Sequence, residues 1–234
     1  MVNITYNNIT PENVGAMLAN KPVLTHSEIR RTVYTVPMRG DLLGTDLYRG
    51  NAIWQLLFHM SNDEYMKAIR GVRQWLSGTG ILELSDTPDS YYEVLQVEHT
   101  EDFRQADDYG RLNTNFTVYP YEFLKSGDIA INGNDTIENE ADPSMPLFEI
   151  TGSGSGILSV TKNGVTKAMN YTVDGTLFID TRKFYAYKIV DGEKVNQSNQ
   201  VTGDYEDLYF VTGDNTVSAT EGTLKTYPRW GYVI

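Results

Sequence analysis

The 234-residue sequence contains no cysteine and few cationic side chains. Without cysteine, disulfides, thiolate nucleophiles and cysteine-ligated metal centres are excluded. The chain has 19 Lys and Arg against 31 Asp and Glu, a formal net charge of −12. This balance argues against a nucleic-acid binder with a basic surface, because such binding depends on neutralising phosphates. The longest apolar runs, such as Leu56-Leu57-Phe58, are far shorter than the roughly 18 residues that span a bilayer, so no membrane insertion is expected.

Catalytic motifs are also scarce. The three histidines, His26, His59 and His99, are not paired at helical spacing, and no nucleophile elbow or phosphate loop occurs. The glycine-rich run 152–156 is followed by neither a lysine nor a helix, so we interpret it as a flexible turn. Acidic clusters fall in turn contexts; a calcium site in 128–142 or a glycosidase carboxylate pair is the alternative. We expect no enzyme, no cofactor and no metal.

A helix is predicted in the first half of the chain. Ser61 is a candidate N-cap, and Glu64 three residues later completes a capping box. An apolar stripe follows at helical spacing; it comprises Tyr65, Ile69, Val72, Trp75 and Leu76. Gly78 favours the left-handed conformation that ends helices. We therefore expect a helix over about 62–77, with Trp75 in a core.

Most of the remaining sequence favours strands. Tyr91–His99 and Leu112–Tyr119 alternate as strands do, and Pro120 is expected to end the second. After residue 150, tight turns are indicated at Asn163-Gly164, Asp174-Gly175, Asp191-Gly192 and Gly213-Asp214-Asn215. The segments between them predict seven short strands, namely Ile157–Thr161, Val165–Val173, Thr176–Asp180, Phe184–Val190, Tyr205–Val211, Thr216–Ala219 and Leu224–Tyr227. Such a series is typical of an antiparallel sandwich.

The polar, turn-rich stretch 125–146 separates these two halves and offers few core residues. We therefore expect two domains, 1–125 and 126–234, in a mainly β protein.

Short motifs follow one another along nearly the whole chain. Their residues are Pro37, Arg39, Gly40 and Asp41 in a V-P-M-R-G-D turn, Trp75 and Leu76 at the helix end, Asp86 and Pro88 after a short strand, Pro120 and Tyr121, Asp180 in I-D-T, and Gly213 and Asn215 in a late turn. In this order the motifs resemble those of the distal tail protein (Dit) family of long-tailed bacteriophages. Met38 and Thr212 depart from the glycine and proline usual in that family.

The resemblance implies an N-terminal, ring-forming β-sandwich with one flanking α-helix, and a C-terminal galectin-like antiparallel β-sandwich. It implies a homohexameric ring at the tail tip of the virion, assembled in the bacterial host cytoplasm. This hub would join the tail tube protein to the tail-associated lysin or tip protein, and would carry a receptor-binding protein for host adhesion. DNA would be present only in transit through the lumen of the ring.

Two alternatives stay open at this point. The galectin-like domain could be a carbohydrate-binding module for host cell-wall attachment, or the chain could be a cell-wall glycosidase. For a hub, an acidic lumen would let DNA pass, because a basic one would hold its phosphates. The candidate lumen charges are Glu101, Asp102, Asp107 and Asp108. The other interpretation of these residues is that they keep an outer turn soluble.

Overall fold

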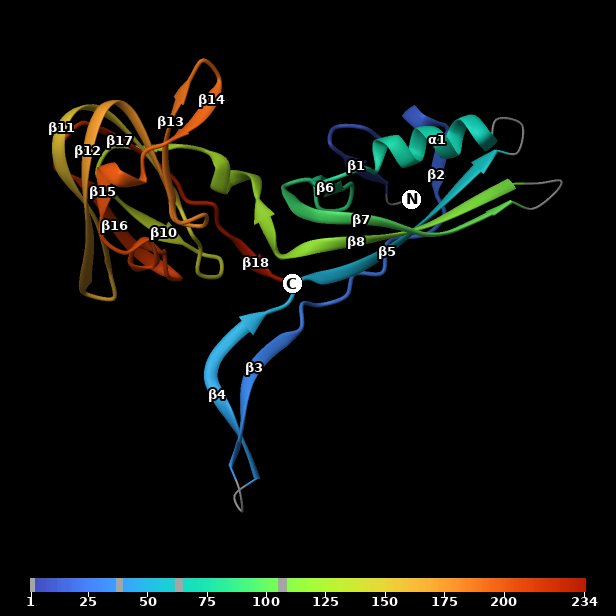
Figure 1. The fold of residues 1–234 in the computed structure, drawn as a ribbon, viewed down its shortest axis with the longest axis horizontal. Coiled ribbons are helices and arrows are strands. Elements are labelled where there is room, and N and C mark those ends of the chain that lie inside the picture. Colours follow the sequence, from blue (N-terminus) through green and yellow to red (C-terminus); the bar gives the residue numbers. More distant parts are fainter. Residues whose placement is uncertain (1–2, 37–39, 62–64, 105–108) are drawn as a thin grey trace. The chain divides into compact units, whose positions relative to one another are not determined.

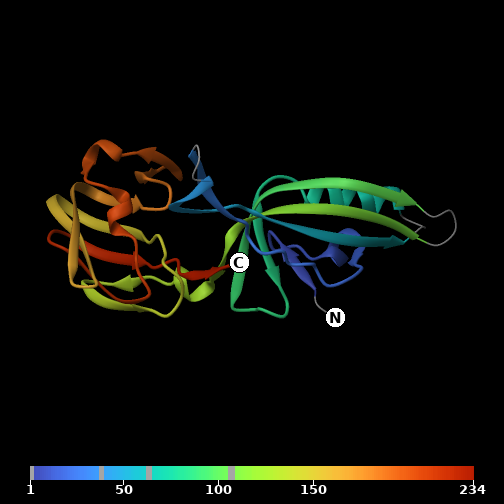
Figure 2. The same cartoon turned by 90° about the horizontal axis from the view of Figure 1, so that it is seen from below.

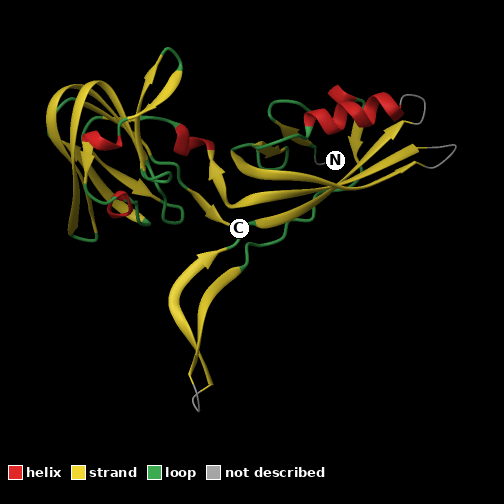
Figure 3. Cartoon of the chain, in the orientation of Figure 1, coloured by secondary structure: helices red, strands yellow, loops and turns green. Residues whose placement is uncertain are grey.

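The computed structural model describes residues 3–36, 40–61, 65–104 and 109–234, and it divides into two units. The first unit extends to Glu122 and includes Val233 and Ile234, and the second unit is Phe123–Tyr232. Strands dominate both units (Figure 3), so the predicted mainly β fold class is confirmed. The sequence placed the division near residue 125, and it gave no sign that the chain returns to the first unit.

A seven-stranded sheet with the order β1-β6-β7-β8-β5-β2, and with β18 beside β8, forms the first unit. Its elements are β1 (Ile4–Tyr6), the 3-10 helix η1 (Pro11–Val14), β2 (Ala16–Leu18), β5 (Ala52–Ser61), α1 (Tyr65–Trp75), β6 (Gly80–Leu84), β7 (Ser90–Arg104), β8 (Tyr109–Leu124) and β18 (Gly231–Val233). The helix lies along one face of the sheet (Figures 1 and 2). Between them lies the core of this unit, which includes Trp54, Phe58 and Phe116.

The helix α1 carries the predicted apolar stripe into this core. Tyr65, Ile69, Val72 and Trp75 are buried, and Gly78 has the left-handed φ of +79° expected of a helix stop. The helix is shorter than the predicted 62–77. Ser61 belongs to β5 instead, because the pairing of β5 with β8 continues to Ser61 and Tyr109. The remaining positions of the proposed capping box, 62–64, lie outside the described residues.

Pro120 does not end its strand, contrary to our prediction, since β8 continues to Leu124. The last pair between β5 and β8 is Ala52–Val118, so β5 no longer requires an N–H from the proline. The carbonyl of Pro120 instead accepts a hydrogen bond of 3.2 Å from the N–H of Ile234, whose own carbonyl accepts one of 2.8 Å from Ser27. Residues at both ends of the sequence therefore complete the first unit.

Two further strands, β3 (Ile29–Val36) and β4 (Gly40–Arg49), form a separate two-stranded sheet (Figure 1). Their register shifts between Arg31 and Val33, as at a β-bulge. The motif residues Gly40 and Asp41 begin β4, and their backbones pair with Val36 and Thr35. Pro37, Met38 and Arg39 lie outside the described residues.

The second unit contains a nine-stranded antiparallel sheet. Its elements are η2 (Lys125–Asp128), β9 (Ile131–Asn132), β10 (Asp135–Asn139), β11 (Leu147–Lys162), β12 (Val165–Asp180), β13 (Tyr185–Val190), β14 (Glu193–Asn196), η3 (Ser198–Gln200), β15 (Val201–Thr202), η4 (Tyr205–Leu208), β16 (Gly213–Ala219) and β17 (Thr223–Tyr227). Ile137 and Ala141 are buried, so the stretch 125–146 contributes more to the core than expected.

The long, curved hairpin of β11 and β12 organises this unit (Figure 1). The turn at Asn163-Gly164 has positive φ at both residues and closes the hairpin as predicted. The first part of β11, Leu147–Thr151, pairs with β17, and the last part, Leu158–Lys162, pairs with β16. The β11–β12 hairpin therefore connects the part of the sheet that contains β17 to the part that contains β16.

The run 152–156 is not a flexible turn, and Asp174-Gly175 is not a hairpin turn. Both lie within this ladder, where Gly152 pairs with Gly175. A Cβ on Gly152 would lie 2.8 Å from the Cα of Gly222, and one on Gly156 would lie 2.5 Å from the hydroxyl of Tyr171. The glycines are therefore required by close packing and by the bend of the strands.

Three other local expectations have mixed outcomes. The predicted strand Tyr205–Val211 is the short helix η4 followed by an isolated bridge between Phe210 and Ser144. The predicted turn at 213–215 is the start of β16. The turn at Asp191-Gly192 does connect β13 to β14, with positive φ at both residues.

Candidate functional site

One face of the first unit's sheet is turned away from α1. Successive side chains of β5 alternate between the two faces. Trp54, Leu56 and Phe58 are buried, whereas Ile53 is 57% exposed. Two further apolar side chains near the β2 edge are exposed, Met17 at 63% and Val23 at 61%. Exposed apolar side chains that gather along one sheet edge indicate an interface rather than a solvent face.

The neighbouring positions of this face along β5 and β8 are polar. Ile53, Gln55 and His59 stand opposite Thr117, Asn115 and Arg111 of β8 in the sheet register. Burial, and then the positive charge of Arg111, hold the pKa of His59 below its ordinary value. The imidazole is therefore neutral near pH 7.

Two of the candidate lumen charges, Glu101 and Asp102, were expected in a turn. They lie in strand β7 instead. Strand β7, which neighbours β8 in the sheet, continues through both residues to Arg104. Asp107 and Asp108 lie outside the described residues. The acidic lumen therefore stays a prediction.

The described motif residues do not converge on one site. Asp86 makes an ion pair of 2.5 Å with Lys21, and this hydrogen bond lowers the pKa of the carboxyl group. Pro88 lies in the turn between β6 and β7. Tyr121 stacks on Tyr119 of the same strand, with ring centroids 5.7 Å apart. Each residue stabilises its own turn or strand end.

Two motif residues of the second unit are buried and fix backbone segments. The carboxylate of Asp180, 1% exposed, accepts hydrogen bonds of 2.8 and 3.3 Å from both terminal nitrogens of Arg229. The fully buried side chain of Asn215 accepts from the N–H of Val211 and donates to the carbonyls of Val211 and Gly213. Bonds of this kind make both residues structural.

A buried lysine was missed by the sequence analysis. Lys162 donates hydrogen bonds of 2.9 and 2.8 Å to the carbonyls of Asp207 and Tyr209, and its Nζ lies 3.1 Å from the centre of the Tyr209 ring. Burial lowers its pKa to about 8, against the opposing charge of Asp207. The sequence did contain a signal for this burial. Alternate residues of a strand face the same side, and Lys162 follows the buried Leu158 and Val160 at a spacing of two.

Nothing in the described residues amounts to a catalytic or metal centre. No group of three or more His, Asp or Glu in the described ranges is placed to hold a metal ion. Within the same ranges, no helix is long and apolar enough to cross a membrane.

The comparisons with solved structures show that the fold of this chain is similar to that of phage tail hub and baseplate proteins. Along the sequence itself, no family model and no curated protein matches. Among solved structures, the chain matches the SPP1 Dit (gp 19.1) protein, described as a paradigm of the hub adsorption apparatus in phages that infect Gram-positive bacteria. The TM-score is 0.70, the identity 9%, and the match covers 97% of each chain.

A second match is to a structure of the phage p2 baseplate in its activated conformation with Sr. Here the TM-score is 0.52 and the identity 8%, again over 97% of each chain. The resemblance indicated by the order of the motifs is thus confirmed at the level of the fold, which is Dit-like over the whole length. The structural neighbours are hub and baseplate proteins of phage tails.

Proposed function

We propose that this protein is a structural hub of a long-tailed bacteriophage tail tip, a distal tail protein located in the virion. It forms a homohexameric ring that joins the tail tube protein to the tail-associated lysin or tip protein and to the host-recognition apparatus. The observation that carries this proposal is the agreement in fold with SPP1 Dit over 97% of both chains. Its role is mechanical and not enzymatic.

The first unit supports a ring because its sheet ends in two different edge strands, β1 and β2. A closed ring of identical subunits requires two different patches on each subunit. Edge strands offer unpaired backbone groups that a neighbour can use. The exposed side chains of Met17, Val23 and Ile53 gather at the β2 edge. We assign that edge to one of the two ring contacts.

The lumen and the outer partners are further parts of the proposal. Glu101, Asp102, Asp107 and Asp108 would line the channel, and like charge would keep DNA from binding within a Debye length of about 8–10 Å. A ring structure with a neutral or basic lumen would contradict this assignment. The second unit, the galectin-like domain of the family, would carry the receptor-binding protein.

The direct test is the mass of the full chain in solution, measured by light scattering and native mass spectrometry. The hub proposal predicts a species of six times 26.4 kDa, formed alone or on addition of the tail tube and tip proteins. A chain that stays monomeric at high concentration with both partners present would overturn it.

A further inference from the structure

One edge of β12 is left without a strand partner over part of its length. On one side β12 pairs with β11 throughout. On the other side it pairs with β15 at Asn170 and Tyr171, and with β13 at 178–180. Between these contacts, the fully described second unit places no strand against residues 172–177. The short helix η3 and Gln197 lie beside this gap instead.

Two adjoining hollows follow the gap and share Thr172 and Gln200 in their walls. Their volumes are about 200 and 390 Å³, and the larger falls in the roughly 300–1,000 Å³ range of ligand sites. We call the two together the β12 groove. Besides the two shared residues, its polar lining consists of Ser155, Asn170, Asp174, Thr176, Lys188, Gln197, Asn199 and Thr202.

The walls of the groove are held in place by bonds that leave its carboxamides available. The N–H of Gln197 donates to the carbonyl of Ala186 at 2.7 Å, and the hydroxyl of Ser198 accepts from the N–H of Ala186 at 3.2 Å. These bonds fix η3 against β13. Among the described residues, the side-chain amides of Asn170, Asn199 and Gln200 make no hydrogen bond within the protein.

The composition of the lining selects a class of ligand. Carboxamides and hydroxyls both donate and accept hydrogen bonds, as the hydroxyls of a sugar do. The groove has one acidic and one basic side chain, Asp174 and Lys188, so it offers no net charge to an ionic ligand. Its apolar groups are few, namely the side chains of Leu177 and Ile157 and the ring of Tyr171, and they give little surface to an apolar ligand.

We propose that the β12 groove binds a neutral saccharide chain, with the carboxamides of Asn170, Asn199 and Gln200 bonding its hydroxyls. The two adjoining hollows offer room for more than one sugar ring. A peptide that adds a strand to β12 is disfavoured because η3 lies beside the free edge. This inference does not depend on ring assembly.

The test uses the full-length protein and three neutral trisaccharides, maltotriose, cellotriose and chitotriose. Binding is followed by ligand-observed NMR and by calorimetry. We expect at least one trisaccharide to bind saturably with a Kd of about 1 mM or tighter. The variants Asn170→Ala and Gln200→Ala should each weaken it about tenfold, the effect of one lost hydrogen bond between neutral groups.

Gln74→Ala provides the matched control, because Gln74 is an exposed carboxamide of α1 in the first unit. It should leave the Kd unchanged, and all three variants should melt as the parent does. If no trisaccharide binds, or if binding is insensitive to both groove variants, the proposal is overturned. Binding of a neutral threonine–valine decapeptide that the groove variants abolish, without saccharide binding, would also overturn it.

Discussion

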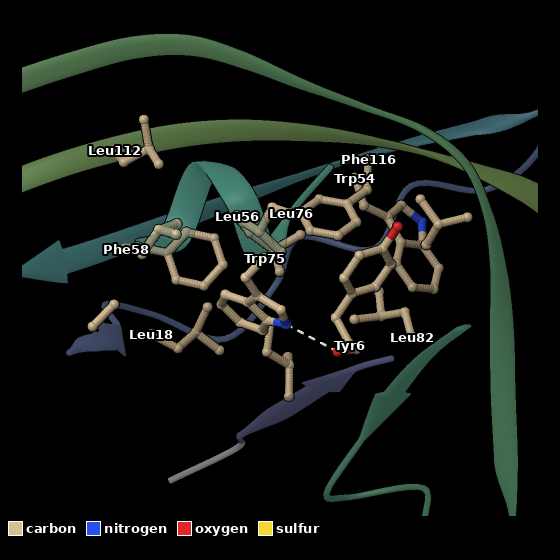
Figure 4. Packing of buried hydrophobic residues seen from close by; sticks show 14 of the residues in the cluster. Tyr6, Leu18, Trp54, Leu56, Phe58, Trp75, Leu76, Leu82, Leu112 and Phe116 are labelled. Carbon is tan, nitrogen blue, oxygen red and sulfur yellow. Dashed lines mark hydrogen bonds between the residues drawn. The ribbon is translucent and has the colours of Figure 1, made fainter. Parts of the chain in front are cut away.

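The indole Nε1 of Trp75 donates a hydrogen bond of 2.9 Å to the backbone carbonyl of Tyr6 (Figure 4). This bond joins the last turn of α1 to β1, two elements 69 residues apart in the sequence. The two rings also meet edge to face, with centroids 6.5 Å apart, and Phe58 contacts the same indole at 5.8 Å. Trp75 thus connects the helix to both β1 and β5.

Replacing this side chain should destabilise the first unit. Trp75→Ala removes a buried ring and is expected to lower the free energy of unfolding by about 3–5 kcal/mol. Trp75→Phe keeps an aromatic ring and removes only the indole hydrogen bond to the Tyr6 carbonyl, which still accepts one from the N–H of Ile9, so this variant should cost less. Urea unfolding measures the free energy of unfolding of both variants. Gln74→Ala, at the exposed neighbouring position of α1, is the control. A Trp75→Ala protein that unfolds like the parent but fails to assemble would make Trp75 an interface residue.

Two methionines of similar exposure allow a matched test of the β2 edge. Met17 lies in β2 and is 63% exposed, and Met66 lies on α1 and is 53% exposed. Met17→Asp places a charge in the proposed ring contact, where desolvation penalises it, so the proposed hexamer should dissociate. Met66→Asp should leave the mass unchanged. Sedimentation velocity distinguishes the outcomes, and equal behaviour of the two variants would remove β2 from the interface.

Lys162 should give the second unit a measurable dependence on pH. Its pKa is about 8 in the folded protein, below the ordinary value of 10.5. Between these two values the unfolded chain holds more protons than the folded one, so stability rises with pH there. The expected result is that the parent gains stability relative to Lys162→Met between pH 8 and 10.5. Denaturant titrations at several pH values test this, and a constant difference would contradict it.

The bend of β11 provides a fourth prediction. Gly152→Ala would bring a methyl group to 2.8 Å from the backbone of Gly222, which has no side chain to move aside. Overpacking of this kind costs about 1–3 kcal/mol. Ser153→Ala, at the exposed neighbouring position in the same strand, should be close to neutral. Thermal unfolding compares the two, and a harmless Gly152→Ala would mean that the strand accommodates a side chain there.

Local chemistry made part of this fold predictable. The apolar stripe ending at Gly78 and the turns at Asn163-Gly164 and Asp191-Gly192 depend on residues close together in sequence, and they form as expected. Asp174-Gly175 carries the same signal as those turns but lies inside a ladder. What decides its conformation is Gly152, opposite it in β11, and the contact of Gly152 with Gly222. Such distant pairings leave no mark in a local pattern.

The β12 groove illustrates the same limit. Its walls come from β11, β12, β13, η3 and β15, so no fixed spacing links them. One sequence signal was available, the amide-rich run Asn196-Gln197-Ser198-Asn199-Gln200, but it resembles a solvated turn until β12 is placed beside it. The overall resemblance was more informative than any single residue, because the order of many weak motifs reflects the whole topology.

The hydrogen bonds of Ile234 with Ser27 and Pro120 also constrain the order of events during synthesis on the ribosome. Every residue of the second unit precedes Ile234 in the sequence, so these bonds can form only after the whole second unit has been synthesised. The sheet with its exposed β2 edge is thus completed late.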